Sequence, residues 1–290
     1  MTTHPLTSTP MPGTVRIAGV ALKWLRFDKD ANLERGKKLI HEAAANGAQI
    51  VVTSECFLDG YMADENTIPL RMFRELAEPV PDGQHFRQLS ALAAELGIYL
   101  VVGMVERNCE LFHNSAALIG PDGEHAGTYR KEMLCPEDQI RCTAGDGPKV
   151  FDTQYGRVGF RICYDRGFPE VVKATCDAGA DFVILVSGGT YGEGNTKMIQ
   201  SRARENGKYM IFVHPVHFLV AGPDGSILAD LRFGGTGEPP PDGYFRHSLI
   251  NSHAIVRGMV IGTEQIGTEI DENGVGYFDM PRVAAAAGTR

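Results

Sequence analysis

The sequence lacks the features that typify membrane proteins and nucleic-acid-binding proteins. It contains no run of about 18 apolar residues, and its start, MTTHPLTSTPMP, has neither the basic residues nor the apolar stretch of a signal peptide. The net charge is -8 at pH 7, and the Lys and Arg residues are scattered rather than clustered. We therefore expect a cytoplasmic protein whose partners are small molecules and that binds neither nucleic acid nor membrane.

The cysteines give no sign of a disulfide framework or a zinc site. The chain of 290 residues has six of them, irregularly spaced and without a C-x-x-C pair, which is typical of reduced thiols. The pairs Cys135 with Cys142 and His214 with His217 come nearest to a set of metal ligands, but buried thiols and hydrogen-bonded histidines are much commoner than ligands. We expect no metal.

The motifs of two large enzyme classes are also absent. No G-x-S-x-G occurs, which argues against a Ser-His-Asp hydrolase. The glycine-rich SGGTYGEGN (187–195) fits neither G-x-G-x-x-G nor G-x-x-x-x-G-K-[ST], so we predict a loop near the mouth of a site rather than a nucleotide cradle. A papain-like enzyme needs a histidine beside its cysteine, and the sequence leaves His214 and His217 open for that role.

Apolar strands and amphipathic helices alternate along the chain. A hydrophobic content of 43% in 290 residues predicts a large core, in one domain or two fused halves. Asp30 precedes the first predicted helix, which Gly47 ends. Predicted strands lie at 15–22, 48–55, 99–107, 115–131, 149–163, 181–188 and 209–216, and predicted helices at 31–46, 86–97, 169–179 and 196–207. This alternation is typical of an α/β protein. The turn GPDG occurs at 120–123 and again at 222–225, a weak sign of two similar halves.

Three chemically capable residues stand where apolar strands end. Glu55 ends one strand, Lys131 ends a hairpin and Cys163 ends another. Ligands of α/β sheets bind at the carboxyl ends of strands. Each residue alone is more simply explained as a solvated or packed side chain, so their meaning depends on the surrounding sequence.

That context resembles the nitrilase superfamily of carbon-nitrogen hydrolases. The matching stretches follow in order over roughly residues 15–230: AQIVVTSECFLDGY, NSAALIGPDGEHAGTYRKEML, GRVGFRICYDRGFPEV, AGADFVILVSGG and SRARENGKYMIFV. The resemblance implies an α/β fold, a four-layer α-β-β-α sandwich of the nitrilase type with two similar halves. It also implies hydrolysis of nonpeptide C–N bonds, no cofactor, and assembly into homodimers or larger homo-oligomers.

The resemblance assigns Cys163 as nucleophile, Glu55 as general base and Lys131 as the cation at the developing oxyanion. The family also carries a further acidic residue after the lysine, for which we choose Glu137, with Asp138 as the alternative. These roles suit the chemistry, because a thiol with a pKa of about 8.5 needs a base or a cation to attack an amide.

The residues after the nucleophile bear on the substrate. Here Cys163 is followed by Tyr164 and Asp165, whereas nitrilases of the superfamily commonly read Cys-Trp-Glu, so the chain resembles the amidase and carbamoylase branches. We predict that Tyr164 supplies a backbone N–H to the oxyanion, that Asp165 positions the nucleophile loop, and that Tyr61, with neighbouring Asp59, lies at the rim of the site.

Arg166 has two interpretations: a bidentate contact with a substrate carboxylate or a structural ion pair. We expect a small linear amide or N-carbamoyl substrate. The alternatives are a nitrile hydrolase, an acyltransferase, and a catalytically silent scaffold. For the domain organisation we predict a flexible N-terminus (1–13), a catalytic domain (14–233) and a C-terminal extension (234–290) that packs on the domain or on a partner subunit.

Overall fold

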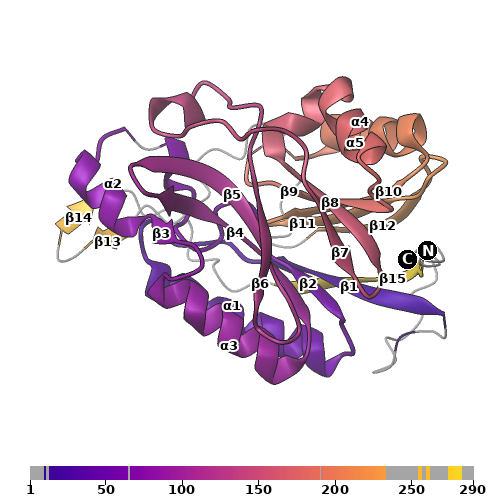
Figure 1. Cartoon of the computed structure of the whole chain (residues 1–290), viewed down its shortest axis with the longest axis horizontal. Coiled ribbons are helices and arrows are strands. Elements are labelled where there is room, and N and C mark those ends of the chain that lie inside the picture. The colour runs from indigo at the N-terminus through magenta and orange to yellow at the C-terminus, as the bar shows by residue number, and fades with distance from the viewer. Residues whose placement is uncertain are drawn as a thin grey trace, which may run out of the picture.

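Two β-sheets lie face to face in the computed structural model, with helices on the outside of each (Figure 1). The structure describes residue 10 and residues 13–64, 66–189, 191–232, 254–256, 259–261 and 274–282. The arrangement is the predicted four-layer α-β-β-α sandwich. Most of the predicted N-terminus (1–13) and of the C-terminal extension lies outside the described residues.

The first sheet has the strand order β15-β1-β2-β4-β5-β6, and β3 also pairs with β4. Strands β1, β2 and β4 run parallel, and β4, β5 and β6 form an antiparallel meander. The strands are β1 (Thr14–Ala21), β2 (Ile50–Val52), β3 (Glu78–Pro79), β4 (Tyr99–Asn108), β5 (Leu111–Ile119), β6 (His125–Arg130) and β15 (Gly274–Pro281).

Helices α1 (Lys29–Ala45) and α3 (Gln84–Leu96) cover the outer face of this sheet, and the short α2 (Leu70–Leu76) lies beyond its end (Figure 1). The sequence placed Asp30 before the first helix, but the cap is Asp28, whose Oδ1 accepts a hydrogen bond of 2.9 Å from the N–H of Ala31. Helix α3 ends at Gly97 as predicted, in the left-handed conformation (φ 63°) that glycine adopts without strain.

The second sheet has the order β12-β11-β10-β9-β8-β7, with α4 (Pro169–Asp177) and α5 (Glu193–Asn206) on its outer face (Figure 1). Its strands are β7 (Val150–Thr153), β8 (Gly156–Ile162), β9 (Phe182–Val186), β10 (Tyr209–His214), β11 (His217–Ala221) and β12 (Ile227–Arg232). Strands β8, β9 and β10 run parallel at its centre, so their carboxyl ends share one edge.

The core lies mainly between the sheets. Ile17 of β1 and Val52 of β2 pack in one cluster with Phe160 of β8 and Ile184 of β9. Side chains of alternate residues point to opposite faces of a strand, so Ala18 of β1 belongs instead to the layer beneath α1 and α3. Burying one such large apolar side chain contributes about 1.5–3 kcal/mol, which explains why these strands read as continuous apolar runs.

The two GPDG turns have the same local structure. Asp122 Oδ1 accepts the N–H of Glu124 at 3.0 Å, and Asp224 Oδ1 accepts that of Ser226 at 2.9 Å. The second glycine of each turn, Gly123 or Gly225, has a φ of 82°. Each turn joins two antiparallel strands at the edge of its sheet, so the repeat in the sequence corresponds to a repeat in the fold.

Three strands lie within the described part of residues 234–290. Strand β15 pairs antiparallel with β1 along its whole length, and Arg16 forms an ion pair of 2.7 Å with Asp279. Strands β13 (Ala254–Val256) and β14 (Met259–Ile261) form a separate two-stranded sheet.

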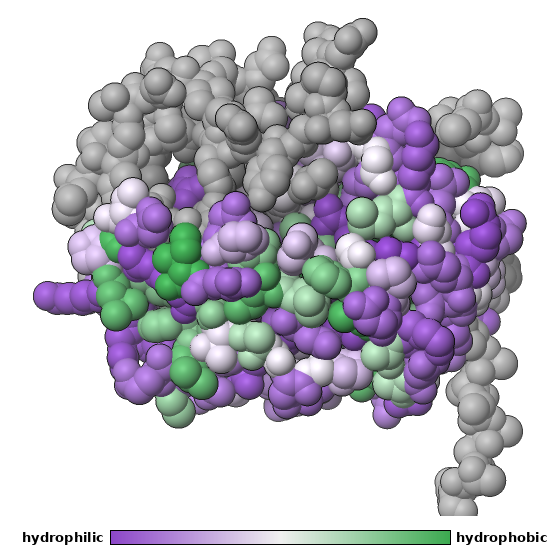
Figure 2. Space-filling model, turned by 90° about the horizontal axis from the view of Figure 1, so that it is seen from above, coloured by the Kyte–Doolittle hydropathy of each residue, from purple (hydrophilic) through white to green (hydrophobic). Residues whose placement is uncertain are grey.

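The surface seen in Figure 2 is mostly hydrophilic, with hydrophobic side chains in patches between the polar ones. Large apolar side chains that are exposed include Leu70, Leu111, Ile140, Tyr164, Leu228 and Leu231. Single exposed apolar residues are ordinary on a folded protein. Among the described residues, no helix combines the length and apolarity needed to cross a bilayer.

Candidate active site

The three residues predicted at strand ends come together where the two sheets meet. Glu55 follows β2, Lys131 follows β6 and Cys163 follows β8. The ammonium Nζ of Lys131 lies 3.0 Å from Glu55 Oε1, and both side chains are fully buried. Glu55 Oε2 accepts the N–H of Gly188 at 2.7 Å, and a Cβ built on the next residue, Gly189, would lie 3.3 Å from Cys163 Sγ. The thiol and the carboxylate therefore flank the same glycine pair.

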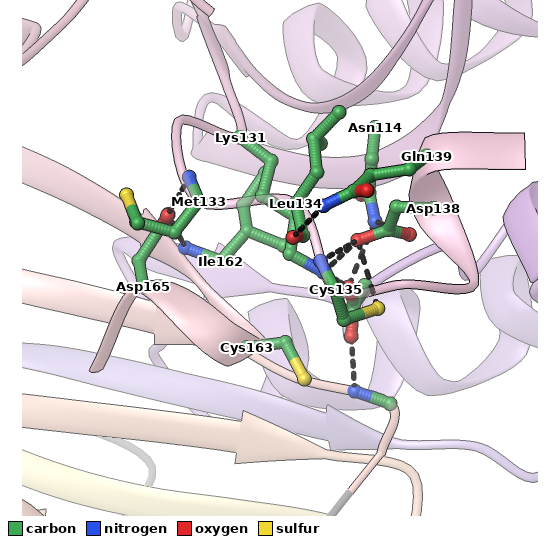
Figure 3. A network of polar contacts seen from close by, with 12 residues as sticks. Asn114, Lys131, Met133, Leu134, Cys135, Asp138, Gln139, Ile162, Cys163 and Asp165 are labelled. Carbon is green, nitrogen blue, oxygen red and sulfur yellow. Dashed lines mark hydrogen bonds and ion pairs between the residues drawn. The ribbon is translucent and has the colours of Figure 1, made fainter. Parts of the chain in front are cut away.

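Lys131 pairs with a second carboxylate, that of Asp138. Its Nζ lies 2.5 Å from Asp138 Oδ2, and this aspartate is also fully buried (Figure 3). The geometry favours the alternative Asp138 over our choice of Glu137, because Asp138 is fully buried against Lys131 whereas Glu137 is only partly buried. Asp138 opens a 3-10 turn (Asp138–Ile140) that directs its side chain inward.

Asn114, in the middle of β5, contacts both carboxylates. Its Nδ2 donates to Glu55 Oε1 at 2.8 Å and to Asp138 Oδ1 at 3.3 Å, and its backbone carbonyl accepts the N–H of Lys131 at 2.8 Å. No motif in the sequence singled out this residue. The available signal was a polar Asn-Ser pair within an otherwise apolar strand, since buried polar side chains need partners.

Burial and charge set the proton affinities of the cluster. Loss of solvent raises the pKa of Glu55, and the nearby Asp138 carboxylate raises it further, while Lys131 opposes both. For Lys131, burial acts against the charged form, but the carboxylates of Glu55 and Asp138 outweigh it and raise its pKa well above the usual value. Glu55 is thus a carboxylate with enhanced proton affinity beside a lysine that stays charged, which suits a general base next to a cation.

Cys163 is held in an unusual backbone conformation. It has a φ of 44° at the start of a 3-10 turn (Cys163–Gly167), a conformation that costs a non-glycine residue of order 1 kcal/mol or more. Asp165 stabilises the turn by accepting three hydrogen bonds: from the N–H of Ile162 at 2.9 Å, from Tyr129 Oη at 2.7 Å and from the N–H of Met133 at 2.8 Å. The predicted positioning role of Asp165 therefore has a clear geometric basis (Figure 3).

The side chain of Arg166 serves the nucleophile turn. Its guanidinium is buried, and it donates to Asn195 Oδ1 at 2.6 Å and to the backbone carbonyl of Cys163. A guanidinium engaged in this way fixes the turn from inside the protein. These two contacts support the structural interpretation of Arg166 over the substrate-binding one, which stays a prediction.

The predicted rim residues lie in different surroundings. Tyr61 is buried, stacks on Trp24 with ring centroids 6.0 Å apart, and places its Oη 4.0 Å from the Cβ position of Gly189. Asp59 is buried beneath this loop, where it accepts the N–H groups of Met62 and Val105 at 2.9 and 2.7 Å. Burial raises the pKa of Asp59 to about 6. Tyr61 therefore lies beside the Cys163 thiol, and Asp59 holds the backbone of the loop that carries Tyr61.

The Tyr164 side chain is 44% exposed and packs edge-on against Phe168, 5.1 Å between ring centroids. Its side chain is thus at the surface, and the predicted oxyanion contact concerns only its backbone N–H, which follows the nucleophile in the turn.

His214 lies close to the site without being able to act as a papain-like base. Its Nδ1 accepts the N–H of Val216 at 3.3 Å, so Nε2 carries the proton and donates to the carbonyl of Gly189 at 3.1 Å. Burial lowers the pKa of His214 well below its usual value. His217 is occupied too, with Nε2 2.8 Å from Asp230 Oδ1. Both histidines left open by the sequence have structural partners.

No three His, Cys, Asp or Glu side chains within the described ranges gather in a way that could hold a metal ion. Among the described residues, no third ligand therefore joins the pair Cys135 and Cys142 or the pair His214 and His217.

The family can now be assigned. A model of the carbon-nitrogen hydrolase family matches residues 16–237. The chain belongs to the carbon-nitrogen hydrolase family. The matched range includes all the residues of the buried cluster and both sheets, except β15 and the first two residues of β1.

Known carbon-nitrogen hydrolases resemble the chain in sequence and in fold. Omega-amidase NIT2-B of Xenopus laevis is 34% identical over 229 residues, which cover 71% of this chain and 80% of that protein. A nitrilase of Pyrococcus abyssi is 35% identical over 170 residues, 58% of this chain and 63% of the nitrilase. The crystal structure of an amidase from Nesterenkonia sp. shares the fold, with a TM-score of 0.69 at 21% identity over 94% of this chain and 93% of that one.

Proposed function

We propose that this carbon-nitrogen hydrolase cleaves the C–N bond of a small linear amide or N-carbamoyl compound through an acyl group bound to Cys163. The observation that carries the proposal is the convergence of Glu55, Lys131 and Cys163 from three strand ends on one largely buried cluster. A thiol, a carboxylate with raised proton affinity and a fixed ammonium are the groups that thioester chemistry on an amide requires.

The reaction follows from these positions. Glu55 takes the thiol proton while Sγ of Cys163 attacks the carbonyl carbon, and the oxyanion forms beside the ammonium of Lys131 and the N–H of Tyr164. Glu55 then gives its proton to the leaving nitrogen, the C–N bond breaks and ammonia departs. In the second half, Glu55 removes a proton from water, the hydroxide adds to the thioester carbon, and the acid leaves as Sγ regains a proton.

The space beside the thiol favours a small acyl group. Apart from the residues next to Gly189 in the chain, only Cys163 Sγ and Tyr61 Oη among the described atoms lie within 4 Å of its Cβ position. A methyl-sized part of an acyl group therefore has room between Gly189 and Tyr61. The aromatic stack of Tyr61 on Trp24 closes the space on that side.

Amides are the favoured class over nitriles. The name of the omega-amidase relative supports amide hydrolysis, and the Cys163-Tyr164-Asp165 sequence resembles the amidase and carbamoylase branches. The Pyrococcus relative is named a nitrilase, so a nitrile hydrolase is the second candidate. Homo-oligomeric assembly stays a prediction from the resemblance.

The test is ammonia release from a panel of linear amides, ureido acids and nitriles, with Cys163→Ala as the blank. We expect release from amides or ureido acids and an intact-mass increase equal to the acyl group during turnover. Release from nitriles alone would replace the proposal by the second candidate. No ammonia and no adduct across the panel would support a silent scaffold.

A further inference from the structure

The side chain of Asn114 contacts the buried cluster and takes no part in strand pairing. The pairing of β5 with β4 uses the backbone of Asn114, opposite Val105, and its amide group points away from the ladder into the site (Figure 3). Its amide nitrogen reaches Glu55 Oε1 at 2.8 Å and Asp138 Oδ1 at 3.3 Å. Its amide oxygen accepts a long contact of 3.7 Å from Cys56 Sγ.

We propose, building on the proposed function, that Asn114 is a positioning residue that holds the carboxylates of Glu55 and Asp138 around Lys131 and keeps Glu55 ready to accept the thiol proton. The amide donates one hydrogen to each carboxylate, so a single rigid group fixes the separation of the two acceptors. Lys131 then lies between them, 3.0 Å from Glu55 and 2.5 Å from Asp138.

The charge balance explains why a neutral donor is needed. With both carboxylates ionised and the lysine protonated, the cluster carries an excess negative charge in the absence of solvent, and such a charge is costly unless hydrogen bonds offset it. Glu55 Oε2 receives the Gly188 N–H, and Oε1 receives Asn114 and Lys131. The titratable groups around Glu55 are Lys131, Asp138, Tyr61, Cys56, Cys135, Cys142 and, across the glycine pair, Cys163. Of these, only Lys131 carries a positive charge.

Removing the amide should therefore favour the protonated form of Glu55. A hydrogen bond to a charged group contributes about 1.5–3 kcal/mol, which corresponds to about one to two pH units. Since protonated Glu55 cannot act as a base, the acidic limb of the pH–kcat profile should move upward. The loss of activity should then shrink as the pH is raised.

The experiment compares Asn114→Leu and Asn114→Ser with Ser115→Ala. Ser115 is the next residue on β5, fully buried, and its hydroxyl bonds Glu106 at 2.7 Å on the opposite face of the sheet. Its removal costs a buried hydrogen bond without touching the cluster. For each folded variant, kcat and KM are measured between about pH 5 and 9 on the best substrate of the wild type.

We expect Asn114→Leu to lower kcat at neutral pH about tenfold or more, with KM changed less than about threefold. Its acidic limb should move up by about one to two units, and Asn114→Ser should fall between it and the wild type. Ser115→Ala should keep the wild-type profile. A pH-independent loss in the Asn114 variants would overturn the inference, and so would failure of both to fold while Ser115→Ala folds. Inactivity of the wild type on every substrate would instead count against the proposed function.

Discussion

The two sheets contribute opposite kinds of group to the site. The first supplies the charged groups of Glu55, Lys131 and Asp138 and the neutral amide of Asn114. All four come from its strands or the loops that follow them, and all are fully buried. The second supplies Cys163, which is 8% exposed, and the glycine pair after β9. The charged groups are thus held out of contact with solvent, whereas Cys163 and the neighbouring Tyr61 are each slightly exposed.

The difference shows how a duplicated architecture is used asymmetrically. Strands β2 and β9 each end at the junction, but one is followed by a carboxylate and the other by Gly188, whose N–H binds that carboxylate. Asp165 links the halves from the other side, because it joins its own turn to Tyr129 and Met133 of the first half. Neither half holds all the groups of the proposed mechanism, so that mechanism requires the two halves to pack together.

Removing the positive charge of Lys131 should have the largest effect on kcat. Lys131→Met is expected to lower kcat by roughly a hundredfold or more, because no other described cation contacts the cluster to stabilise the oxyanion. The control is Lys149→Met, which removes an exposed lysine paired with Asp146 at 3.1 Å. A rate near that of the wild type for Lys131→Met would remove this lysine from the mechanism.

Loosening the link between the halves should have the next largest effect. Asp165→Asn puts an amide NH2 where donors already point, so we expect a loss of about 1–3 kcal/mol in the free energy of unfolding and a tenfold or greater drop in kcat. Asp152→Asn, at an exposed ion pair in the same half, should change neither. Chemical denaturation and steady-state kinetics measure the two quantities. An unchanged kcat in a destabilised Asp165→Asn protein would show that the turn holds Cys163 without this carboxylate.

Adding a methyl group at Gly189, in the second half, should change the selectivity between acyl groups more than the rate on the smallest one. The methyl group of Gly189→Ala would lie about 3.3 Å from Sγ, so kcat/KM should fall at least about tenfold more for the larger acyl groups than for the smallest one. Gly167→Ala is the matched control, since its Cβ meets no described atom within 4 Å. Equal losses for all acyl sizes would place the acyl group elsewhere.

Chelation should have no effect. Dialysis against EDTA should leave activity unchanged because Lys131, rather than a metal, is expected to stabilise the oxyanion. Loss of activity that added zinc restores would contradict the cofactor-free mechanism.

The alternation of apolar runs and helices predicted an α/β fold, whereas the four-layer sandwich and the roles of the three strand-end residues came from the resemblance to the nitrilase superfamily. Apolar runs marked the buried strands, and each of Glu55, Lys131 and Cys163 stood at the end of one. Glu137 and Asp138 could not be separated this way, since they are neighbours in a loop and only the 3-10 turn decides which carboxylate points inward.

Other contacts depend on the packing of the two sheets. Asn114 and Glu55 are hydrogen-bonded but lie 59 residues apart in the sequence, and the hydrogen-bonded Gly188 and Glu55 lie 133 residues apart. Arg166 carries a charge that suggested a ligand, but its neighbours Asn195 and the Cys163 carbonyl become visible only in the folded chain. Long-range partners of this kind leave no signal in spacing.

The most direct test of the central claim, that packing of the two halves activates Cys163, is the order in which the cysteines react. Cys109 is exposed, Cys135 and Cys176 are half-buried, and Cys56 and Cys142 are buried, so exposure alone would direct a small electrophile to Cys109. With substoichiometric iodoacetamide at neutral pH, peptide mapping should show Cys163 alkylated first, activity falling in proportion, and protection by substrate. Prior alkylation of Cys109 with activity intact would contradict activation, and full alkylation of Cys163 without loss of activity would exclude it as the nucleophile.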